Sequence, residues 1–354
     1  MKRFRYIIFL ALLVGCWLAS AYAADVAPGR TWLAFKQIVE KEQTVYLADP
    51  AGWSKQAVVT GSKVAVFIQG KRFLYLQGQK LYEYYVADGS RRFICEFKEP
   101  KIALEVMSDG PDQALVAAED ELGVNWYILE LSDGSVRKIA MRGGFGSKQL
   151  SSPDQSTAIA FKPGLMDFRI GLAVQQKKRV IWESPGDQMV IPEAVWSPDS
   201  KYFAFYAKKY DENYDGFYNL YLFDVAARKL KLVQDRSFTV LFSNLRMGPF
   251  APTWSVDGKS LVFQYQLYGT VGRTGLLKYQ VETGKKTLLG TSDGVNEYPS
   301  WSPDNQWIAV LTSREGNGQQ VWVTDPQGEQ WQRIAPAQGV TEWAQWYSSN
   351  PVKK

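Results

Sequence analysis

A short phrase, Trp-Ser-Pro-Asp, recurs with variations along this chain and constrains its fold more than any other feature of the sequence. Each copy joins one apolar segment to a second through a Pro-Asp or Asp-Gly turn. Pro presets φ for a turn position, and Asp or Gly completes the reversal of the chain. The copies begin at Ser108, Ser151, Trp196, Trp254 and Trp301. The phrase therefore predicts a series of β-hairpins.

The spacing of these hairpins predicts the architecture. Seven residues mark the middle of the second apolar segment in successive units: Ala34, Leu74, Ala117, Ala160, Ala204, Val262 and Ala309. They are 40, 43, 43, 44, 58 and 47 residues apart. A period of about 40–45 residues with four strands per unit is typical of propeller blades. We predict an all-β fold, a single seven-bladed β-propeller of four-stranded blades, with six or eight blades as the alternatives.

The two ends of the repeat predict how the ring closes. In the fifth unit four strands can be read, at Glu193–Ser197, Tyr202–Ala207, Asn219–Val225 and Lys229–Val233. The first unit lacks its first strand, and the segment Thr341–Ser349 copies Asn296–Asp304 with nothing after it. We expect this C-terminal strand to pair with the N-terminal blade, because closure removes an open sheet edge.

The first 23 residues have the pattern of an export signal. A basic segment, Met1–Arg5, precedes an apolar one, Tyr6–Leu18, and a small-x-small cleavage site ends at Ala23. We expect residues 1–23 to be removed, which leaves residues 24–354 as the propeller. The mature protein would then be periplasmic or secreted.

A second reading of the same segment leads to a membrane-anchored lipoprotein. Leu13–Cys16 resembles a bacterial lipobox, which would place the cleavage before Cys16 and a lipid on its sulfur. The residues after Cys16 stay apolar, so we favour cleavage after Ala23. A lipid at Cys16 would be the protein's membrane contact in this alternative.

Charge argues against nucleic acid as a partner. The chain has 41 basic and 36 acidic residues, a net charge of +5, and loss of Lys2, Arg3 and Arg5 with the signal reduces it to +2. No run of Lys and Arg interleaved with aromatic residues stands out.

The chain contains no histidine, which removes the usual residues of several enzyme classes. Ser-His-Asp and Cys-His pairs, imidazole bases and His-bound metals are all excluded. After cleavage only Cys95 remains, and a lone Cys on a strand is most often a buried apolar residue. We therefore expect no catalytic residues. Glycoside cleavage by Asp and Glu alone stays open as the alternative.

One acidic loop in the fifth unit resembles half of a calcium site. Asp211, Asn213 and Asp215, followed by Gly216, match the start of the loop D-x-N-x-D-G, in which alternate side chains direct oxygen ligands at one point. The bidentate Glu of a full loop is missing, since Leu222 stands there. The alternative is a solvated acidic loop.

The long spacing between the fifth and sixth units locates the candidate binding face. The extra residues fall in two loops, 208–218 and 234–252, and the connections 266–275 and 313–319 share their face by propeller geometry. Tyr, Phe and Arg are enriched at interface anchors. The candidates for partner binding are Tyr210, Tyr214, Tyr218, Phe242, Arg246, Tyr268 and Arg273.

The phrase at Trp196, Trp254 and Trp301, followed by strands such as Tyr221–Asp224, resembles the repeat of TolB-type β-propellers, relatives of the WD-repeat propellers. The resemblance covers nearly the whole mature chain. TolB-type proteins carry an α/β domain ahead of a six-bladed propeller, and we expect no room for one here. The resemblance implies a monomeric, non-catalytic module of the bacterial cell envelope that binds a protein partner. A polysaccharide-binding or Asp/Glu-dependent glycan-active propeller is the alternative.

Overall fold

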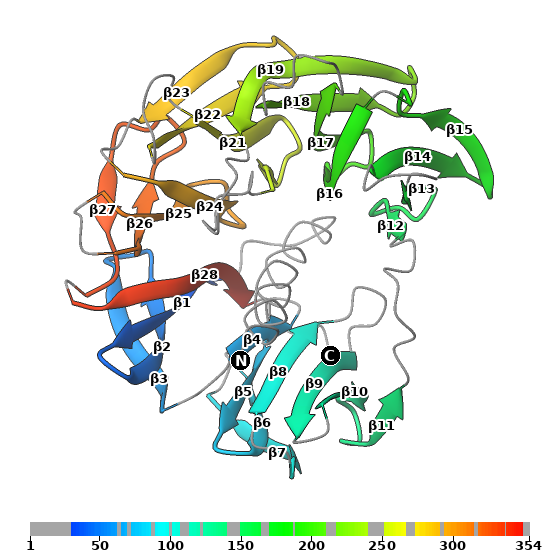
Figure 1. Cartoon of the computed structure of the whole chain (residues 1–354). Helices are drawn as coiled ribbons and strands as arrows, with labels where there is room; N and C mark the ends of the chain where they lie inside the picture. The colour runs from blue at the N-terminus through cyan, green and yellow to red at the C-terminus, as the bar shows by residue number, and fades with distance from the viewer. Residues whose placement is uncertain are drawn as a thin grey trace. The chain divides into compact units, whose positions relative to one another are not determined.

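The computed structural model describes residues 30–61, 65–68, 72–85, 89–98, 101–106, 113–120, 123–139, 149–163, 170–186, 188–209, 217–239, 251–266, 273–290, 294–314, 318–336 and 338–349. Every regular element in these ranges is a β-strand (Figure 1). None of the described residues forms a helix long and apolar enough to cross a membrane. The predicted all-β class is confirmed.

The strands of the described residues form seven antiparallel sheets of four strands each, in two compact units. Unit 1 comprises Val26–Gly143 and Ile334–Lys354 and holds three sheets. The first, in spatial order, is β28 (Val340–Ser349), β1 (Arg30–Val39), β2 (Glu42–Asp49) and β3 (Ser54–Thr60). The second is β4 (Ala65–Ile68), β5 (Arg72–Gln77), β6 (Lys80–Tyr85) and β7 (Arg91–Glu96). The third is β8 (Lys101–Val106), β9 (Gln113–Asp120), β10 (Gly123–Glu130) and β11 (Val136–Ile139).

Unit 2, Gly144–Arg333, holds the other four sheets. The first is β12 (Gln149–Ser151), β13 (Thr157–Pro163), β14 (Ile170–Gln176) and β15 (Arg179–Glu183). The second is β16 (Gln188–Trp196), β17 (Tyr202–Lys209), β18 (Phe217–Asp224) and β19 (Lys229–Thr239). The third is β20 (Thr253–Trp254), β21 (Ser260–Gln266), β22 (Thr274–Gln280) and β23 (Lys286–Gly290). The fourth is β24 (Asn296–Trp301), β25 (Ile308–Thr312), β26 (Gln320–Thr324) and β27 (Trp331–Arg333).

The repeat markers read from the sequence all fall in the second strand of a sheet, so the phase of the repeat was predicted correctly. Ala34, Leu74, Ala204, Val262 and Ala309 are fully buried there. Second strands such as β5 and β25 are buried on both faces, whereas fourth strands such as β7 and β15 consist of exposed and half-buried residues. Apolar residues on both faces require a neighbouring sheet on each side.

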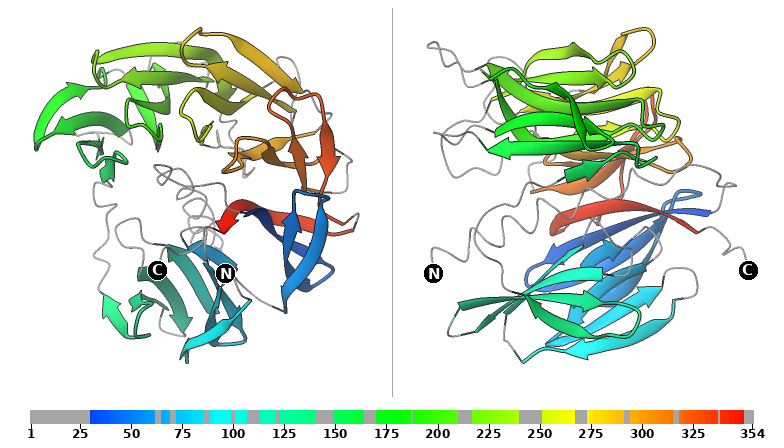
Figure 2. Two further views of the ribbon diagram at one scale, coloured as in Figure 1. Left: turned by 180° about the vertical axis from the view of Figure 1, so that it is seen from behind. Right: turned by 90° about the vertical axis from the view of Figure 1, so that its right-hand side faces the viewer.

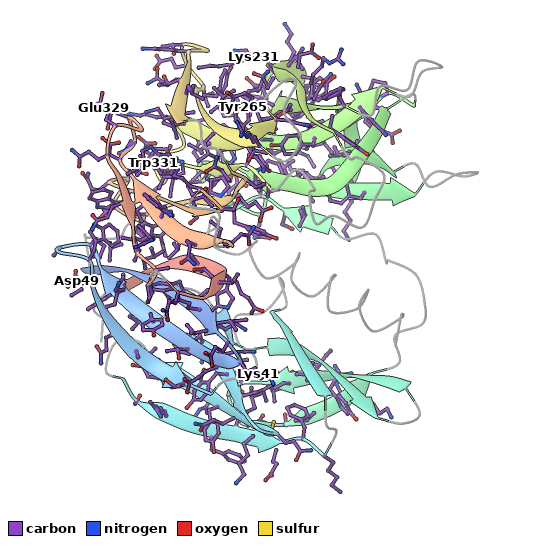
Figure 3. The ribbon with its side chains drawn as sticks, turned by 60° about the vertical axis from the view of Figure 1, so that its left-hand side comes forward. Lys41, Asp49, Lys231, Tyr265, Glu329 and Trp331 are labelled. Carbon is purple, nitrogen blue, oxygen red and sulfur yellow. The ribbon has the colours of Figure 1, made fainter. Side chains whose placement is uncertain are left out.

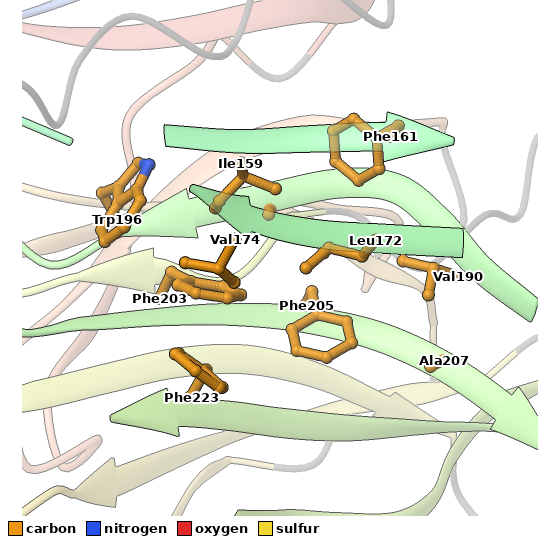
Figure 4. Packing of buried hydrophobic residues seen from close by; sticks show 11 residues of the cluster. Ile159, Phe161, Leu172, Val174, Val190, Trp196, Phe203, Phe205, Ala207 and Phe223 are labelled. Atoms are coloured by element: carbon orange, nitrogen blue, oxygen red, sulfur yellow. The ribbon is translucent and has the colours of Figure 1, made fainter. Parts of the chain in front are cut away.

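Large side chains fill the space between consecutive sheets. In Figure 4, Ile159 and Val174 of one sheet face Phe203, Phe205 and the neighbouring aromatic side chains of the next sheet. The rings of Phe203 and Phe223 stack with centroids 5.0 Å apart. Fully burying one such side chain contributes about 1.5–3 kcal/mol, so the cluster as a whole stabilises the packing of these two sheets.

The recurring Ser-x-Asp turn has the same geometry in all four sheets of unit 2. The Ser hydroxyl donates to the Asp carboxylate two residues later, over 2.5–2.7 Å, at Ser152, Ser197, Ser255 and Ser302. The same hydroxyl accepts a backbone N–H from the residue five positions later, over 2.9–3.0 Å. The repeated Asp therefore caps a turn, as the sequence indicated.

In two of the four copies the residue after this Asp accepts a hydrogen bond from the turn of the preceding sheet. It has positive φ in every copy, as Gln155, Ser200, Gly258 and Asn305. Ser200 Oγ accepts from the backbone N–H of Asp154 over 3.1 Å, and Asn305 Oδ1 accepts from that of Val256 over 2.7 Å.

The Trp of the repeated phrase adds a second tie between sheets. Trp196 Nε1 donates to the carbonyl of Leu150 over 3.2 Å, and Trp254 Nε1 donates to that of Val195 over 3.1 Å. Both tryptophans are buried. The phrase therefore builds a turn and also holds neighbouring sheets together.

The C-terminal strand β28 pairs with β1, as predicted. In Figures 1 and 2 the red strand lies beside the blue one. The antiparallel register places Trp346 opposite Leu33 and runs from Arg30 with Ser349 to Ile38 with Val340, with one irregularity at Lys36 and Gln37. Gln37 Nε2 donates to the carbonyls of Pro336 and Gln338, which ties the segment before β28 to the same sheet.

Unit 1 contains a fully buried carboxylate that the sequence pattern does not indicate. Glu83 on β6 is 0% exposed and lies 2.7 Å from Arg72 Nη1 and 2.8 Å from Arg92 Nη2. Arg92 also donates to the carbonyls of Leu131 and Ser132 in the next sheet. Removing one Arg would leave the charge of Glu83 buried with fewer partners, which is destabilising. The cluster therefore links the second sheet of unit 1 to the third.

The extra residues of the fifth unit are not all loop, which corrects the sequence-based reading of 234–252. Strand β19 continues to Thr239 through irregular pairing in which Tyr218 lies opposite Phe238. Arg236 adopts positive φ, its guanidinium lies 4.4 Å from the centre of the Phe217 ring, and its backbone N–H donates to Asn219 Oδ1 over 2.7 Å. These contacts stabilise a strand where the spacing of the repeat indicated a loop.

Deleting residues 341–354 should remove most of β28 and expose the edge of β1 along with the side chains that Trp346 covers. We expect the melting temperature to fall by about 10 °C or more, because the loss of a paired strand costs several kcal/mol and one kcal/mol shifts the melting temperature by roughly 2–4 °C in domains of 150–250 residues. Calorimetry on this variant and on one lacking only residues 350–354 checks this. An unchanged melting transition in the longer truncation would contradict it.

The Asp154 carboxyl has a pKa below its ordinary value of 3.8. The main cause is the hydrogen bond from the Ser152 hydroxyl, and other donors to Asp154 add to it. The folded state therefore favours the ionised form of Asp154, which adds to the free energy of unfolding. This stabilisation is present above the pKa of the unfolded state and is lost as pH falls through the pKa of the folded state. In urea titrations we expect Ser152→Ala to be less stable than the parent at pH 6 and the gap to narrow below about pH 4. A gap that does not change with pH would show that the hydroxyl acts independently of this carboxylate.

Candidate functional site

The candidate site is the loop end of unit 2. We define the loop end as the edge at which the second strand of each sheet connects to the third and each sheet connects to the next. It includes the ends of β17 and β18, of β21 and β22, and of β25 and β26. Polar side chains are buried there, which distinguishes it from the apolar middle of the sheets.

A hydrogen-bond network joins three side chains from two sheets at the loop end. Gln264 Nε2 donates to Thr274 Oγ1 over 3.1 Å, and that hydroxyl accepts the backbone N–H of Asn296 over 2.7 Å. Thr274 Oγ1 in turn donates to the carbonyl of Asn296 over 3.1 Å, and Asn296 Nδ2 donates to the carbonyl of Thr274. All three residues are at least 98% buried. These bonds pair the donors of the network, whereas the buried Gln264 Oε1 has no hydrogen-bond partner among the described residues. Paired groups in a buried network restrain their surroundings.

The network continues to both neighbouring elements. Ser237 Oγ on β19 donates to the carbonyl of Gln264 over 3.3 Å, and Gln319 Nε2 donates to the carboxylate of Glu297. Glu297 is buried, 6% exposed, on β24. The loop end of three consecutive sheets therefore has a layer of buried polar side chains, which we call the polar base and which includes one carboxylate.

A glycine and a tyrosine shape the surface beside this network. Tyr265 on β21 lies opposite Gly275 on β22, and a Cβ at Gly275 would meet the Tyr265 ring at 2.4 Å. The absence of a side chain lets the ring, labelled in Figure 3, cross the neighbouring strand. Burial raises the pKa of the Tyr265 hydroxyl above 10.0, so it is a neutral hydrogen-bonding group at neutral pH.

Two of the predicted partner-binding residues lie in the described ranges. Tyr218 on β18 is 7% exposed, and Lys208 Nζ lies 4.9 Å from the centre of its ring. Arg273 is exposed and directly precedes Thr274 of the network. Both lie at the loop end, where Tyr218 is buried and Arg273 is exposed. Their role in partner binding stays a prediction. The following lie outside the described residues: Tyr210, Tyr214, Phe242, Arg246, Tyr268, the calcium candidates Asp211, Asn213 and Asp215, and Cys16.

Two further observations bear on chemistry at the described residues. They contain no group of three or more His, Cys, Asp or Glu arranged to hold a metal ion. Cys95 on β7 is half-buried beside the apolar cluster of Leu81 and Phe97, and burial raises the pKa of its thiol to about 11. Since the thiolate is the nucleophile, this Cys is poorly reactive at neutral pH.

Sequence reasoning missed the polar base of the loop end. Gln264, Thr274, Asn296 and Glu297 are dispersed among apolar strand residues and belong to no motif. No repeat signal marks them, because the equivalent positions in other units also carry polar residues, such as Lys36 for Gln264 and Glu342 for Glu297. Their contact depends on the packing of separate sheets, which the repeat period alone does not specify.

Solved structures of other proteins define the class of this fold. The β-propeller domain of the Trilobed protease from Pyrococcus furiosus has a TM-score of 0.53, with 10% identity over 90% of this chain and 98% of that one. Oligogalacturonate lyase from Vibrio parahaemolyticus has a TM-score of 0.53, with 12% identity over 86% of this chain and 92% of that one. At such identities the likeness concerns the fold alone, which is all-β and propeller-like.

A curated relative connects the chain to a particular kind of propeller. The Tol-Pal system protein TolB of Alcanivorax borkumensis is 35% identical over 81 residues. The match covers 23% of this chain and 18% of the length of that relative. No family model matches the chain. The resemblance to TolB-like β-propellers that the Trp-Ser-Pro-Asp phrase predicted is confirmed over the matched stretch.

Replacing Thr274 with Val should destabilise the protein by about 2–4 kcal/mol, because the Gln264 amide and the Asn296 N–H lose their buried acceptor. Urea denaturation measures the change. Thr287→Val on β23 is the matched control, for which we expect a change within about 0.5 kcal/mol. Equal effects of the two substitutions would show that the network contributes nothing.

Proposed function

We propose that this chain is an exported, non-catalytic β-propeller that binds a protein partner through the loop end of its fifth and sixth blades. In this proposal the seven sheets are seven blades, and pairing of β28 with β1 closes the ring. The fifth blade is the sheet β16–β19 and the sixth is β20–β23. The protein acts as an interaction or scaffold module of the bacterial cell envelope.

The observation that carries the proposal is the likeness to TolB, whose name assigns it to the Tol-Pal system. The N-terminal export signal read from the sequence agrees with a role outside the cytoplasm. The matched stretch is short, so the partner of this chain need not be that of its relative. We infer the kind of function from the likeness and the place of binding from the geometry.

The loop end has the properties of a protein-binding face. Its base is held by the buried network of Gln264, Thr274 and Asn296, so exposed residues beside it are presented from a fixed position. Arg273 is one of these, and Arg is enriched among the residues that dominate binding energy. A rigid base lowers the entropy lost on binding.

A non-catalytic role is supported by the residues available. The chain has no His, and the raised thiol pKa of Cys95 keeps it protonated. The fold is shared with oligogalacturonate lyase and with a protease propeller domain, and fold alone does not carry function. Glu297 is the described buried carboxylate at the loop end, where a glycan-active enzyme would use a pair.

Replacing Arg273 with Ala should weaken capture of a specific partner from envelope extracts by about 5–30-fold, the range for an interface Arg. Tyr214→Ala tests the neighbouring predicted position. Arg137→Ala, an exposed Arg on β11 of unit 1, is the matched control and should leave capture unchanged. Quantitative mass spectrometry of the captured proteins measures the effect.

Two results would overturn the proposal. One is equal recovery of the same proteins by all these variants and the parent. The other is hydrolysis of a glycan panel by the purified protein, with loss of that activity in Glu297→Gln, which would support the glycan-active alternative.

A further inference from the structure

The opposite edge of unit 2 carries a concentration of positive charge. We call it the turn end, because the Ser-x-Asp turns lie there together with the turns between third and fourth strands. In the three sheets from β12 to β23, these turns and the residues beside them hold ten exposed basic residues. They are Lys177, Lys178, Arg179, Lys201, Arg228, Lys229, Lys231, Lys259, Lys285 and Lys286.

These basic residues belong to one continuous surface. Ser200 accepts from the turn of the sheet before it, and a Cβ at Gly258 would lie 3.5 Å from Asp199 Cγ, so the three Ser-x-Asp turns are in contact in succession. The outer strands also meet. Lys231 Nζ lies 5.3 Å from the centre of the Tyr279 ring, and Lys286 Nζ donates to Gln234 Oε1 over 2.9 Å. Lys231 is labelled in Figure 3.

The positive charge exceeds the acidic charge in the same segments. Five acidic residues lie there, at Asp154, Asp199, Asp224, Asp257 and Glu282, which leaves an excess of +5. Four of the five accept hydrogen bonds from their own turns. Within the described part of the chain, Lys201 forms an ion pair with Asp199, whereas Lys178, Lys229 and Lys285 form none.

The excess ends at the next sheet. The corresponding turns of β24–β27, residues 302–307 and 324–331, contain Asp304, Asp325 and Glu329 and no Lys or Arg. The positive charge is therefore localised to three sheets of unit 2, and the overall charge of the chain does not explain it.

The kind of residue indicates the kind of partner. Eight of the ten are Lys, a compact point charge on a flexible stem, whereas Arg is the usual residue for bidentate recognition of a single carboxylate or phosphate. Ser156, Gln176 and Lys177 line a hollow at this end. Beside the charges Val180, Leu232 and Leu288 are 46%, 49% and 46% exposed. Dispersed lysines with apolar side chains at their margin suit a broad anionic surface.

We propose that the turn end of the sheets β12–β23 docks onto an anionic lipid bilayer, with the lysines against the phosphate head groups and Val180, Leu232 and Leu288 at the interface. Basic residues near such a surface each contribute to binding, and the attraction falls as salt screens it. The loop end lies at the opposite edge of the same sheets, so the two faces can act at once. This inference does not depend on the protein partner proposed above.

The test is flotation of the purified full chain with vesicles of phosphatidylglycerol and phosphatidylcholine, compared with phosphatidylcholine alone. The variant replaces one exposed lysine per sheet, Lys178→Glu, Lys229→Glu and Lys285→Glu together. The matched control makes the same change in charge in unit 1, at Lys41→Glu, Lys55→Glu and Lys98→Glu. Binding by the parent to neutral vesicles measures any contribution from the N-terminal apolar segment.

We expect the parent to prefer anionic vesicles and to lose that preference at high salt. The turn-end variant should lower the partition coefficient at least about a hundredfold, given roughly fivefold per lysine, and the control should change it by less than about fivefold. If the Glu variant does not fold by circular dichroism, the same positions replaced by Gln provide the test, with about a hundredfold expected for three charges.

Three results would overturn the proposal. The first is equal partition of the parent into neutral and anionic vesicles, and the second is an equal loss in variant and control. The third is binding to polyglutamate or to duplex DNA that matches or exceeds binding to the vesicles and is lost in the turn-end variant. That last result would assign the surface to an acidic polypeptide or a nucleic acid instead.

Discussion

A four-stranded sheet with apolar residues on both faces is stable only between neighbours, and unit 2 of this protein solves that requirement with one repeated turn. The Ser-x-Asp turn closes the first hairpin of each sheet through the Ser hydroxyl. In two copies the residue after the Asp accepts a bond from the turn of the preceding sheet, and Trp196 and Trp254 donate to carbonyls of the preceding sheet. Cores such as that around Phe203 and Phe223 can form because these ties hold the sheets at packing distance.

In this arrangement the two edges of the sheets differ in how much their residues vary from sheet to sheet. The turn end is built from nearly identical hydrogen-bonded hairpins, so changes there are restricted to exposed side chains. The loop end carries no repeated motif, and its buried residues differ from sheet to sheet: Lys208 over Tyr218 in one, the Gln264 and Thr274 network in the next, Glu297 in the third. Variable connections on a regular scaffold are where binding sites usually lie.

The repeat period and the turn chemistry predicted the all-β class, the four strands per sheet, the second-strand position of Ala204 and its counterparts, and the pairing of the C-terminal strand with β1. They predicted less of the candidate site, and that part stays largely a prediction. The buried Glu83 and the Thr274 network depend on contacts between sheets, which no local pattern encodes. The basic surface was missed for the same reason, because its lysines are separated in sequence and adjoin only after the sheets stack. Strand β19 extends beyond its predicted end because Arg236 packs on Phe217.

The pairing of β28 with β1 has a consequence for the order in which the protein can be made. Strand β1 ends at Val39 and its partner begins at Val340, so the first sheet waits for nearly the whole chain to be synthesised. Closing so long a loop is slow, and contacts of this range delay folding. Until then β1 presents an unpaired edge to other chains in the same state. The remaining sheets are each formed from consecutive strands, so the first sheet is the one whose formation depends on the C-terminal strand.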